Sequence, residues 1–273
     1  MPSISVSTYS FRGRESIPHF IAFAERLGVA GIELGTDAHW PDALSSDDRA
    51  AIREAVTRNG WTLNIDYNMK TATLDNFDDA RVQQGISELK ADLSLADELG
   101  AGSVSVRVGL ISNSLPDNLD EVRRKAQTSI ADALREGLPL AESANAYLLI
   151  ENAQLRPLEV LETYDQYNQL VEEIGSSRVK FILDPGHCHT FTGIQDGIDA
   201  LGHNIYSVHF HDNHGERGND EHLEFGKGTI DLNTHADFLR NVPGMISFKG
   251  WDGTDEEGST VRSLDLIRGI LGS

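Results

Sequence analysis

Three residues that could bind a metal ion follow three consecutive hydrophobic segments of the chain. Glu151, Asp184 and His209 each stand at the end of a short run of aliphatic, β-branched or aromatic residues. Since parallel strands of an α/β protein gather their functional residues at their carboxyl ends, these side chains are expected to lie together. Two carboxylates and an imidazole suit Mn²⁺, Mg²⁺, Co²⁺, Fe²⁺ or Zn²⁺. The pattern predicts one bound divalent metal ion; the alternative is three ordinary polar residues at a sheet edge.

A polar segment from residue 212 to residue 231 carries a second set of candidate ligands. Asp220 and His222 are two residues apart and could present an oxygen and a nitrogen to a ligand or to a second metal. Gly226 and Gly228 would let the backbone come close to that ligand, because glycine has no Cβ atom. The alternative is a solvated connection whose histidines have no role.

Strands and helices alternate along the chain, as judged from hydrophobic periodicity and glycine stops. Strands are expected over residues 4–8, 31–35, 61–65, 103–108, 147–151, 179–184, 205–210 and 244–249. Helices are expected over residues 17–27, 46–56, 78–99, 119–144, 158–174, 194–201, 234–240 and 259–270.

The number of these strand-helix units indicates the fold. Eight units are the number that closes a parallel barrel with helices outside. The chain is therefore predicted to be an α/β protein, a single-domain (β/α)8 TIM barrel over residues 1–273. An open doubly wound sheet is the alternative. It is disfavoured because Phe11-Arg12-Gly13, after the first strand, does not supply a Gly-x-Gly-x-x-Gly turn.

Composition limits the compartment and the partners. The net charge of −20 and the pI near 4.7 argue against a nucleic-acid partner, because phosphate binding draws on clustered Lys and Arg. No basic segment followed by an apolar one opens the chain, and no run of about 18 apolar residues occurs. A cytoplasmic protein with no membrane partner is expected. The lone cysteine, Cys188, fits a reducing compartment and is expected to fill space beside the site.

The order and spacing of these motifs resemble the sugar phosphate isomerase/epimerase family of xylose isomerase-like TIM barrels, which is related to endonuclease IV. The resemblance covers nearly the whole chain, and its sharpest parts are Glu151, Asp184-Pro-Gly-His187, His209-Phe-His-Asp212, Asp220-Glu-His222 and Gly226-Lys-Gly228-Thr-Ile-Asp231. It implies a divalent metal held by Glu151, Asp184 and His209. It also places His187 and His222 near the substrate or an additional metal.

The resemblance implies reactions that move a proton next to a carbonyl in ketoses, hydroxy-ketones or inositol-derived polyols. A metal-dependent sugar isomerase or epimerase is therefore expected, working by metal-assisted enolisation. Glu151 is the candidate base, and His187 is the candidate donor to a substrate oxygen. A lyase or dehydratase on the same barrel, or a non-catalytic sugar-binding barrel, are the alternatives. DNA repair is disfavoured by the charge and by the absence of extra histidines after the third and fourth strands.

The eighth strand departs from the family pattern. Members that isomerise or epimerise ketoses usually carry a glutamate there, both as fourth metal ligand and as base. Here Lys249 or Ser247 occupies that position, although Asp252, Glu256 or Glu257 could reach the metal from the following loop. An ammonium beside a metal has a depressed pKa, so Lys249 could act as a base, or it could hold an anionic substrate. The alternative is a strand-end lysine that reaches solvent.

Other residues complete the expected site. Arg107, at the end of the fourth strand, could orient a carboxylate or hydroxyl of the substrate, and the alternative is a salt-bridged arginine at the rim. Trp251 could form an apolar wall, whereas Trp40 and Trp61 are expected to pack, and Glu33 is expected to be a buried barrel carboxylate. The expected partner is a small sugar or polyol-derived substrate, and a homodimer is the default assembly. The substrate and the metal are not fixed by the sequence.

Overall fold

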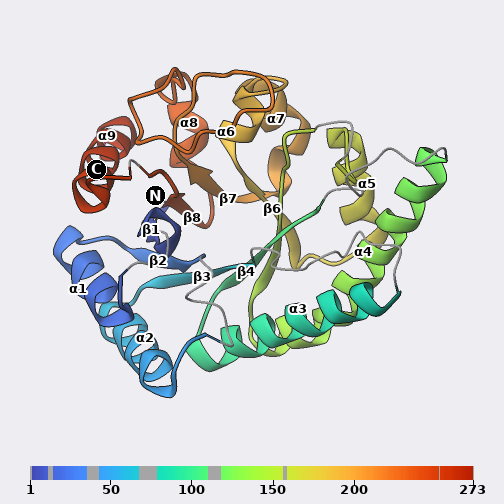
Figure 1. The fold of residues 1–273 in the computed structure, drawn as a ribbon, viewed down its shortest axis with the longest axis horizontal. Helices are drawn as coiled ribbons and strands as arrows, with labels where there is room; N and C mark the ends of the chain where they lie inside the picture. Colours follow the sequence, from blue (N-terminus) through green and yellow to red (C-terminus); the bar gives the residue numbers. More distant parts are fainter. Residues whose placement is uncertain are drawn as a thin grey trace.

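Eight parallel strands close on themselves in the part of the chain that the structure describes. The computed structural model describes residues 2–11, 15–35, 43–67, 79–109, 118–155, 159–251 and 253–272. The strands are β1 (Ser3–Ser7), β2 (Gly31–Leu34), β3 (Thr62–Tyr67), β4 (Ser103–Arg107), β5 (Tyr147–Glu151), β6 (Val179–Leu183), β7 (Ile205–Phe210) and β8 (Met245–Phe248). Each pairs with the next, and β1 pairs with β8, so the sheet is a closed barrel (Figure 1). The predicted (β/α)8 fold is confirmed.

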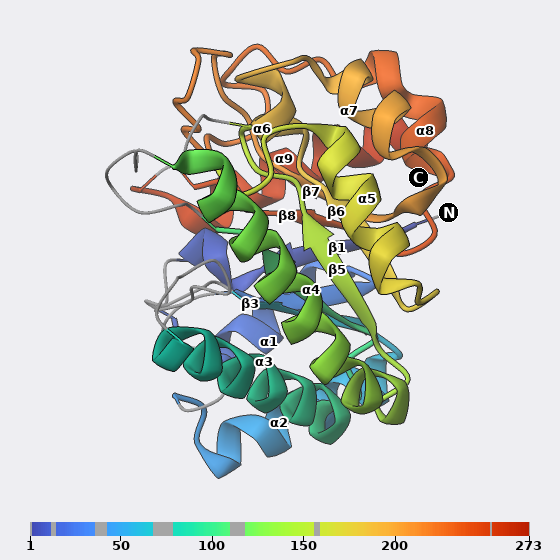
Figure 2. The same cartoon turned by 90° about the vertical axis from the view of Figure 1, so that its right-hand side faces the viewer.

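Helices surround the barrel, as Figures 1 and 2 show. They are α1 (Ile17–Leu27), α2 (Ser46–Asn59), α3 (Asp79–Leu99), α4 (Leu119–Ser143), α5 (Tyr164–Ile174), α6 (Pro185–His189), α7 (Ile194–Leu201), α8 (Ala236–Arg240) and α9 (Glu256–Leu271). Short 3-10 turns occur at Thr8–Phe11, Gly202–Asn204 and Asn233–His235. None of the described helices is both long and apolar enough to cross a bilayer.

Local capping explains where the helices begin and end. The Thr163 hydroxyl accepts a hydrogen bond from the backbone N–H of Gln166, and the Gln166 side-chain oxygen accepts one from the backbone N–H of Thr163. This reciprocal cap starts α5 at residue 164 and not at the predicted residue 158, which lies outside the described residues. The glycine stops held as predicted: α1 and α2 end at Gly28 and Gly60, both with left-handed backbone.

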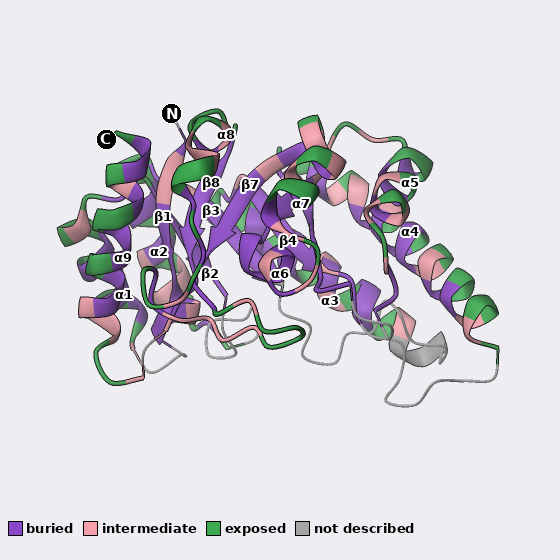
Figure 3. Cartoon of the chain, turned by 90° about the horizontal axis from the view of Figure 1, so that it is seen from above, coloured by how far each residue is buried: buried purple, intermediate pink, exposed green. Residues whose placement is uncertain are grey.

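The barrel has an apolar outer layer and a polar interior. Alternate strand residues pack outward against the helices and are buried there, among them Val6, Ile32, Val104, Ile150, Phe181, Val208 and Phe248. Figure 3 shows this burial concentrated on the strands, with exposed residues on the outer faces of the helices. The interior instead contains buried polar side chains, including Ser7, Glu33, Asn64, Asp66, Ser105, Glu151, His209 and Lys249. Since TIM-barrel interiors are usually filled by branched aliphatic residues, this one is unusual.

A short helix that the sequence did not predict follows β6. The Asp184 carboxylate accepts hydrogen bonds from the backbone N–H groups of Gly186 (2.8 Å) and His187 (3.2 Å) and so caps α6. In α6, Cys188 is 1% exposed, and its sulfur accepts hydrogen bonds from the Tyr164 hydroxyl and the Asn152 amide. Burial raises the pKa of the Cys188 thiol to about 12. The prediction that this cysteine fills space is therefore supported.

We expect Cys188 to be unreactive in the folded protein. Ellman's reagent at mildly alkaline pH should find no accessible thiol before unfolding and one thiol per chain in guanidinium chloride. The reason is that burial and a low thiolate population both slow the reaction. Rapid labelling of the folded protein would mean that the thiol is exposed and available for chemistry.

Candidate metal and substrate site

A small cavity opens at the carboxyl ends of the strands. It has a volume of about 60 Å³ and is lined by Tyr9, Asp66, Arg107, Glu151, His187, His222 and Lys249. The strands deliver most of these groups: β3 carries Asp66, β4 and β5 end at Arg107 and Glu151, and Lys249 directly follows β8. The structure thus brings together five side chains that the sequence analysis had assigned to catalysis or substrate binding.

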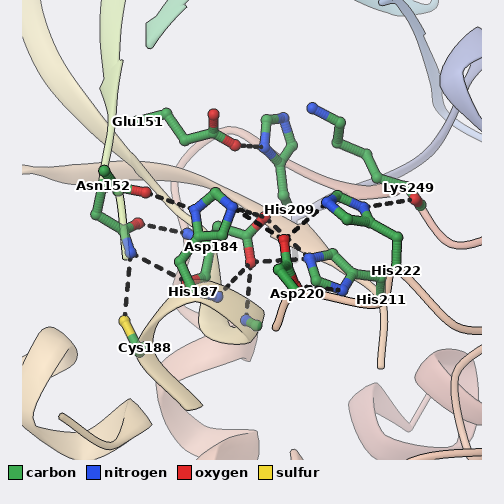
Figure 4. Close-up of polar contacts among 12 residues, drawn as sticks. Glu151, Asn152, Asp184, His187, Cys188, His209, His211, Asp220, His222 and Lys249 are labelled. Carbon is green, nitrogen blue, oxygen red and sulfur yellow. Dashed lines mark hydrogen bonds and ion pairs between the residues drawn. The ribbon is translucent and has the colours of Figure 1, made fainter. Parts of the chain in front are cut away.

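Three histidines and two aspartates form one contact group beside this cavity (Figure 4). We call Asp184, His187, His211, Asp220 and His222 the His-Asp cluster. Asp220 Oδ2 lies 3.2 Å from His187 Nε2 and 2.8 Å from His222 Nε2. His211 Nε2 lies 3.1 Å from Asp184 Oδ1, and His211 Nδ1 lies 3.7 Å from Asp220 Oδ1. The rings of His211 and His222 stack, with centroids 3.9 Å apart.

Backbone carbonyl groups orient the imidazole rings of the His-Asp cluster. His187 Nδ1 donates to the carbonyl oxygen of Asn152 (2.6 Å), and His222 Nδ1 donates to that of Lys249 (3.2 Å). His211 Nδ1 faces the carbonyl oxygen of the next residue at 3.5 Å. Because a carbonyl accepts only, the ring proton sits on Nδ1, and Nε2 is directed at the carboxylates. Histidines that bind a metal ion are commonly oriented by such a hydrogen bond from the ring nitrogen that does not face the metal.

Asn152 and Asp212 hold the elements that carry the cluster. The Asn152 side chain accepts from the backbone N–H of Asp184 (2.6 Å) and donates to its carbonyl oxygen (3.1 Å), which ties the end of β5 to the end of β6. The Asp212 carboxylate accepts from the backbone N–H groups of Gly226 (2.8 Å) and Ile230 (3.0 Å). Asp212 thereby fixes the loop that presents the Asp220 side chain.

The two loop glycines have a different role from the predicted one. Gly226 has a φ of +95°, and a Cβ atom on Gly228 would lie 2.3 Å from an Asp212 oxygen and from the Asn213 carbonyl. At Gly228, the close approach that the structure shows is therefore to Asp212 and Asn213. His222, in the same loop, has a φ of +52°. A non-glycine residue in this region is strained, which is common at functional sites.

His209 does not join the His-Asp cluster. Its Nδ1 atom lies 2.7 Å from Glu151 Oε1, and its Nε2 atom lies 3.0 Å from Glu33 Oε2, so both ring nitrogens face carboxylates. The predicted ligand set of Glu151, Asp184 and His209 is thus not assembled. Among the described residues, Glu151 and Asp184 group with His187, whereas His209 groups with Glu33 and Asp66.

The physical reason is the alternation of side chains along β7. His209 and His211 point to the same side of the strand, about 6.6 Å apart along it. His209 lies within β7, directly after the residue that the register pairs with Leu183, and His211 is the first residue after the strand. The sequence analysis quoted both histidines and predicted His209 as the ligand.

Lys249 is buried and paired, unlike the base of depressed pKa and the solvated lysine considered from the sequence, while its role in holding an anionic substrate stays a prediction. It is 5% exposed, and its Nζ atom lies 2.5 Å from Asp66 Oδ2, across the barrel (Figure 4 shows Lys249 directed toward His209 and Glu151). Burial alone would lower the pKa of Lys249, but the Asp66, Glu151 and Glu33 carboxylates outweigh it and raise the pKa. Lys249 is therefore a fixed cation at neutral pH, neither a base with a depressed pKa nor a solvated lysine.

The ionisable side chains of the barrel interior shift one another's pKa values. Burial alone would raise the pKa of Glu33, but the neighbouring His209 lowers it to about 2. Burial and Lys249 would lower the pKa of His209, but Glu33 and Glu151 raise it to about 10. Glu33 and Glu151 thus both face His209, and Asp66 pairs with Lys249.

The His-Asp cluster differs from the barrel interior because it contains no lysine or arginine, so its positive charge comes only from protons on imidazole rings. Burial alone would lower the pKa of His211, but Asp184 and Asp220 raise it to about 9. Burial, together with the adjacent His211, lowers the pKa of His222 to about 4. A protonated His211 therefore lies between two carboxylates.

The remaining predicted site residues have mixed outcomes. Arg107 lines the cavity as expected, and Glu33 is fully buried, as expected for a barrel carboxylate. Trp251 is not among the described residues that line the cavity; its backbone N–H donates to the His222 carbonyl oxygen (2.7 Å). Glu257 pairs with His19 and Arg26 at the surface, away from the site. Trp40 and Asp252 lie outside the described residues.

Asp66 is the interior residue that the sequence analysis missed. The predicted third strand ended at residue 65, whereas β3 continues to residue 67 and carries Asp66 to the cavity. Asp66 Oδ1 accepts from the Ser105 hydroxyl (2.7 Å). An acidic residue directly after an apolar strand was the available signal, of the same kind that pointed to Asp184.

The sequence comparisons identify the family. The model of the family described as xylose isomerase-like TIM barrel matches residues 21–270. The chain therefore belongs to this family. It also resembles a protein of Methanocaldococcus jannaschii, MJ1614, with 29% identity over 118 residues, which are 43% of this chain and 44% of that protein. The match thus spans less than half the length of the relative.

Solved structures of the same fold include sugar epimerases. A D-tagatose 3-epimerase-like protein superposes with a TM-score of 0.83 at 19% identity, covering 99% of this chain and 97% of that one. L-ribulose 3-epimerase gives 0.81 at 17% identity, with 100% and 95% covered. The IolI protein, solved with a bound zinc atom, gives 0.79 at 17% identity, with 99% and 98% covered. At these identities the likeness establishes the fold.

Replacing Lys249 should destabilise the protein strongly. Lys249→Met leaves the buried Asp66 carboxylate without its cation, so the free energy of unfolding should fall by about 3–5 kcal/mol. Urea unfolding followed by circular dichroism measures this. Adding Asp66→Asn to Lys249→Met should restore part of the loss, because no unpaired charge then remains. A single variant as stable as the wild type would mean that the lysine is solvated.

Proposed function

We propose that the protein is a divalent-metal-dependent isomerase or epimerase acting on a sugar, ketose or polyol-derived hydroxy-ketone. The observation that carries this proposal is the His-Asp cluster, in which three imidazoles direct Nε2 at two carboxylates. The cluster stands at the carboxyl end of a TIM barrel, beside a cavity that also contains a carboxylate suited to proton transfer. The sugar epimerases of the same fold support this substrate class.

We place the metal ion in the His-Asp cluster and not at the originally predicted ligand set. The donor atoms of the cluster are nitrogen and carboxylate oxygen, and each ring is oriented from behind by a carbonyl group. Three imidazoles with two carboxylates favour Mn²⁺, Co²⁺ or Zn²⁺ over Mg²⁺, which prefers oxygen ligands. A bound ion would act as a Lewis acid toward carbonyl or hydroxyl oxygens of the substrate.

Glu151 is the residue that we assign to proton transfer. One of its oxygens is anchored to His209 Nδ1 at 2.7 Å, and the residue lines the cavity. Burial alone would raise the pKa of Glu151, but Lys249 and His209 outweigh it and lower the pKa, so the carboxylate is ionised at neutral pH. It is held in one orientation by His209, ready to accept a proton from carbon. His187, directed at Asp220, is assigned to the metal and not to a substrate oxygen.

Deuterium exchange tests the assigned reaction. With Mn²⁺ or Co²⁺ present in deuterated water, a ketose panel should include a sugar that gains deuterium next to its carbonyl and yields its epimer or isomer, as followed by NMR. Glu151→Gln should reduce exchange by about 10²–10⁴-fold, whereas Glu221→Gln, on the rim loop, should not change it. Loss of water from the substrate would indicate a lyase instead. Sugar binding with no exchange would contradict the proposal and leave a binding protein.

Metal stoichiometry distinguishes the two possible ligand sets. His211→Gln and Asp184→Asn should abolish binding of Co²⁺, measured by elemental analysis after dialysis, whereas the wild type should hold one equivalent. His209→Gln should retain the ion, because that ring serves two glutamates. His214→Gln replaces an exposed histidine of the same loop and serves as the matched control. Loss of the ion in His209→Gln, with retention in His211→Gln, would restore the ligand set predicted from the sequence.

A further inference from the structure

Arg107 is a partly buried cation whose guanidinium has no partner among the described residues. It ends β4, lines the cavity and pairs in register with Glu151 on β5. Yet within the described ranges no hydrogen bond reaches its five N–H donors, and no carboxylate oxygen lies within 4.0 Å of them. A buried arginine is ordinarily paired: Arg123, 7% exposed, lies 2.7 Å from Glu162.

The carboxylates of the cavity are already engaged by other cations. Asp66 pairs with Lys249 at 2.5 Å, and Glu151 pairs with His209 at 2.7 Å. Burial alone would lower the pKa of Arg107, but carboxylates beyond hydrogen-bond distance raise it, in order of effect Glu151, Glu159, Asp184 and Asp220. Arg107 is half-buried and lines the cavity, and none of its nitrogens is among the described buried atoms that lack a hydrogen-bond partner. Its donors are therefore open to the cavity, where an anionic group that entered could accept from them.

Lys249 adds a second set of donors on the opposite wall. An ammonium has three N–H donors, and among the described residues only Asp66 accepts from this one. β4 and β8 lie on opposite sides of the closed barrel. A molecule in the cavity therefore meets a guanidinium at one end and an ammonium at the other, with Glu151 beside the guanidinium.

We propose that the substrate is a sugar acid whose carboxylate binds Arg107, and not a neutral ketose. This rests on the proposed function, which it narrows to keto acids of sugars and polyols. A guanidinium binds a carboxylate through two parallel hydrogen bonds, a geometry that a hydroxyl group cannot match. Lys249 then donates to a carbonyl or hydroxyl oxygen further along the substrate. The cavity, at about 60 Å³, has room for a carboxylate and its neighbouring carbons.

The test compares two ligands of the same carbon skeleton. D-fructose is a neutral ketohexose, and D-fructuronate carries a terminal carboxylate in place of its primary alcohol. Calorimetric titration of the full chain loaded with Mn²⁺ should show the uronate binding about ten- to a hundredfold more tightly. Arg107→Met should remove this preference, and Arg107→Lys should restore part of it.

Controls separate recognition of the acid from a folding defect and from the proposed reaction. Arg217→Met, at an exposed arginine that stacks on Phe191, should leave the preference unchanged, and Arg107→Met should keep the wild-type circular dichroism spectrum and its metal.

Equal affinity for the two ligands, or a preference that survives Arg107→Met, would overturn the inference. Deuterium exchange with D-fructose but not with the uronate would overturn it while upholding the proposed function. Binding of the uronate that depends on Arg107, with no deuterium exchange into any sugar, would uphold the inference and contradict the proposed function.

Discussion

The ion pair between Lys249 and Asp66 crosses the barrel and is the interaction on which the rest of the site depends. The interior of this barrel holds three buried carboxylates where most barrels hold aliphatic side chains. A buried carboxylate is stable only when a cation and further hydrogen bonds compensate it. Lys249 supplies that cation at the end of the eighth strand, and Ser105 and Asn64 supply hydrogen bonds from the neighbouring strands.

The pairing of Lys249 with Asp66 divides the polar side chains of the site into a lower and an upper layer. In the lower layer, His209 bridges Glu33 and Glu151, and Lys249 pairs with Asp66. In the upper layer, the His-Asp cluster contains two aspartates and three imidazoles whose protons an ion can displace. The lysine that replaces the usual family glutamate is consistent with this division, because it removes one carboxylate from the lower layer and adds a cation.

The fold followed from the sequence because periodicity and glycine stops are local signals. Every predicted strand was found with bounds within a few residues, and the regular alternation of units implied closure. The short helix α6 was not predicted, since its start depends on the Asp184 carboxylate folding back onto two backbone N–H groups. The role of Gly228 was also misread, because its close neighbour is the side chain of Asp212, sixteen residues earlier in the chain.

The candidate site could be predicted only in part from the sequence. Glu151, His187, His222 and Lys249 were found from their positions at strand ends and in one polar loop, and they do meet at one cavity. The choice between His209 and His211 could not be made from residue type, because both face the barrel axis and only their depth differs. The direction of the Lys249 pKa shift could not be read from the sequence, since it depends on Asp66 and Glu33, which are more than 180 residues away in the sequence and carried by other strands.

Anomalous diffraction from crystals grown with Mn²⁺ or Co²⁺ tests the central claim most directly, because it locates the ion independently of activity. The account predicts one strong anomalous peak within bonding distance, about 2.1 Å, of imidazole nitrogens in the His-Asp cluster, with His209 still bridging Glu33 and Glu151. A peak bonded to His209 and displacing it from either glutamate would contradict the account, since the lower layer would then hold the metal.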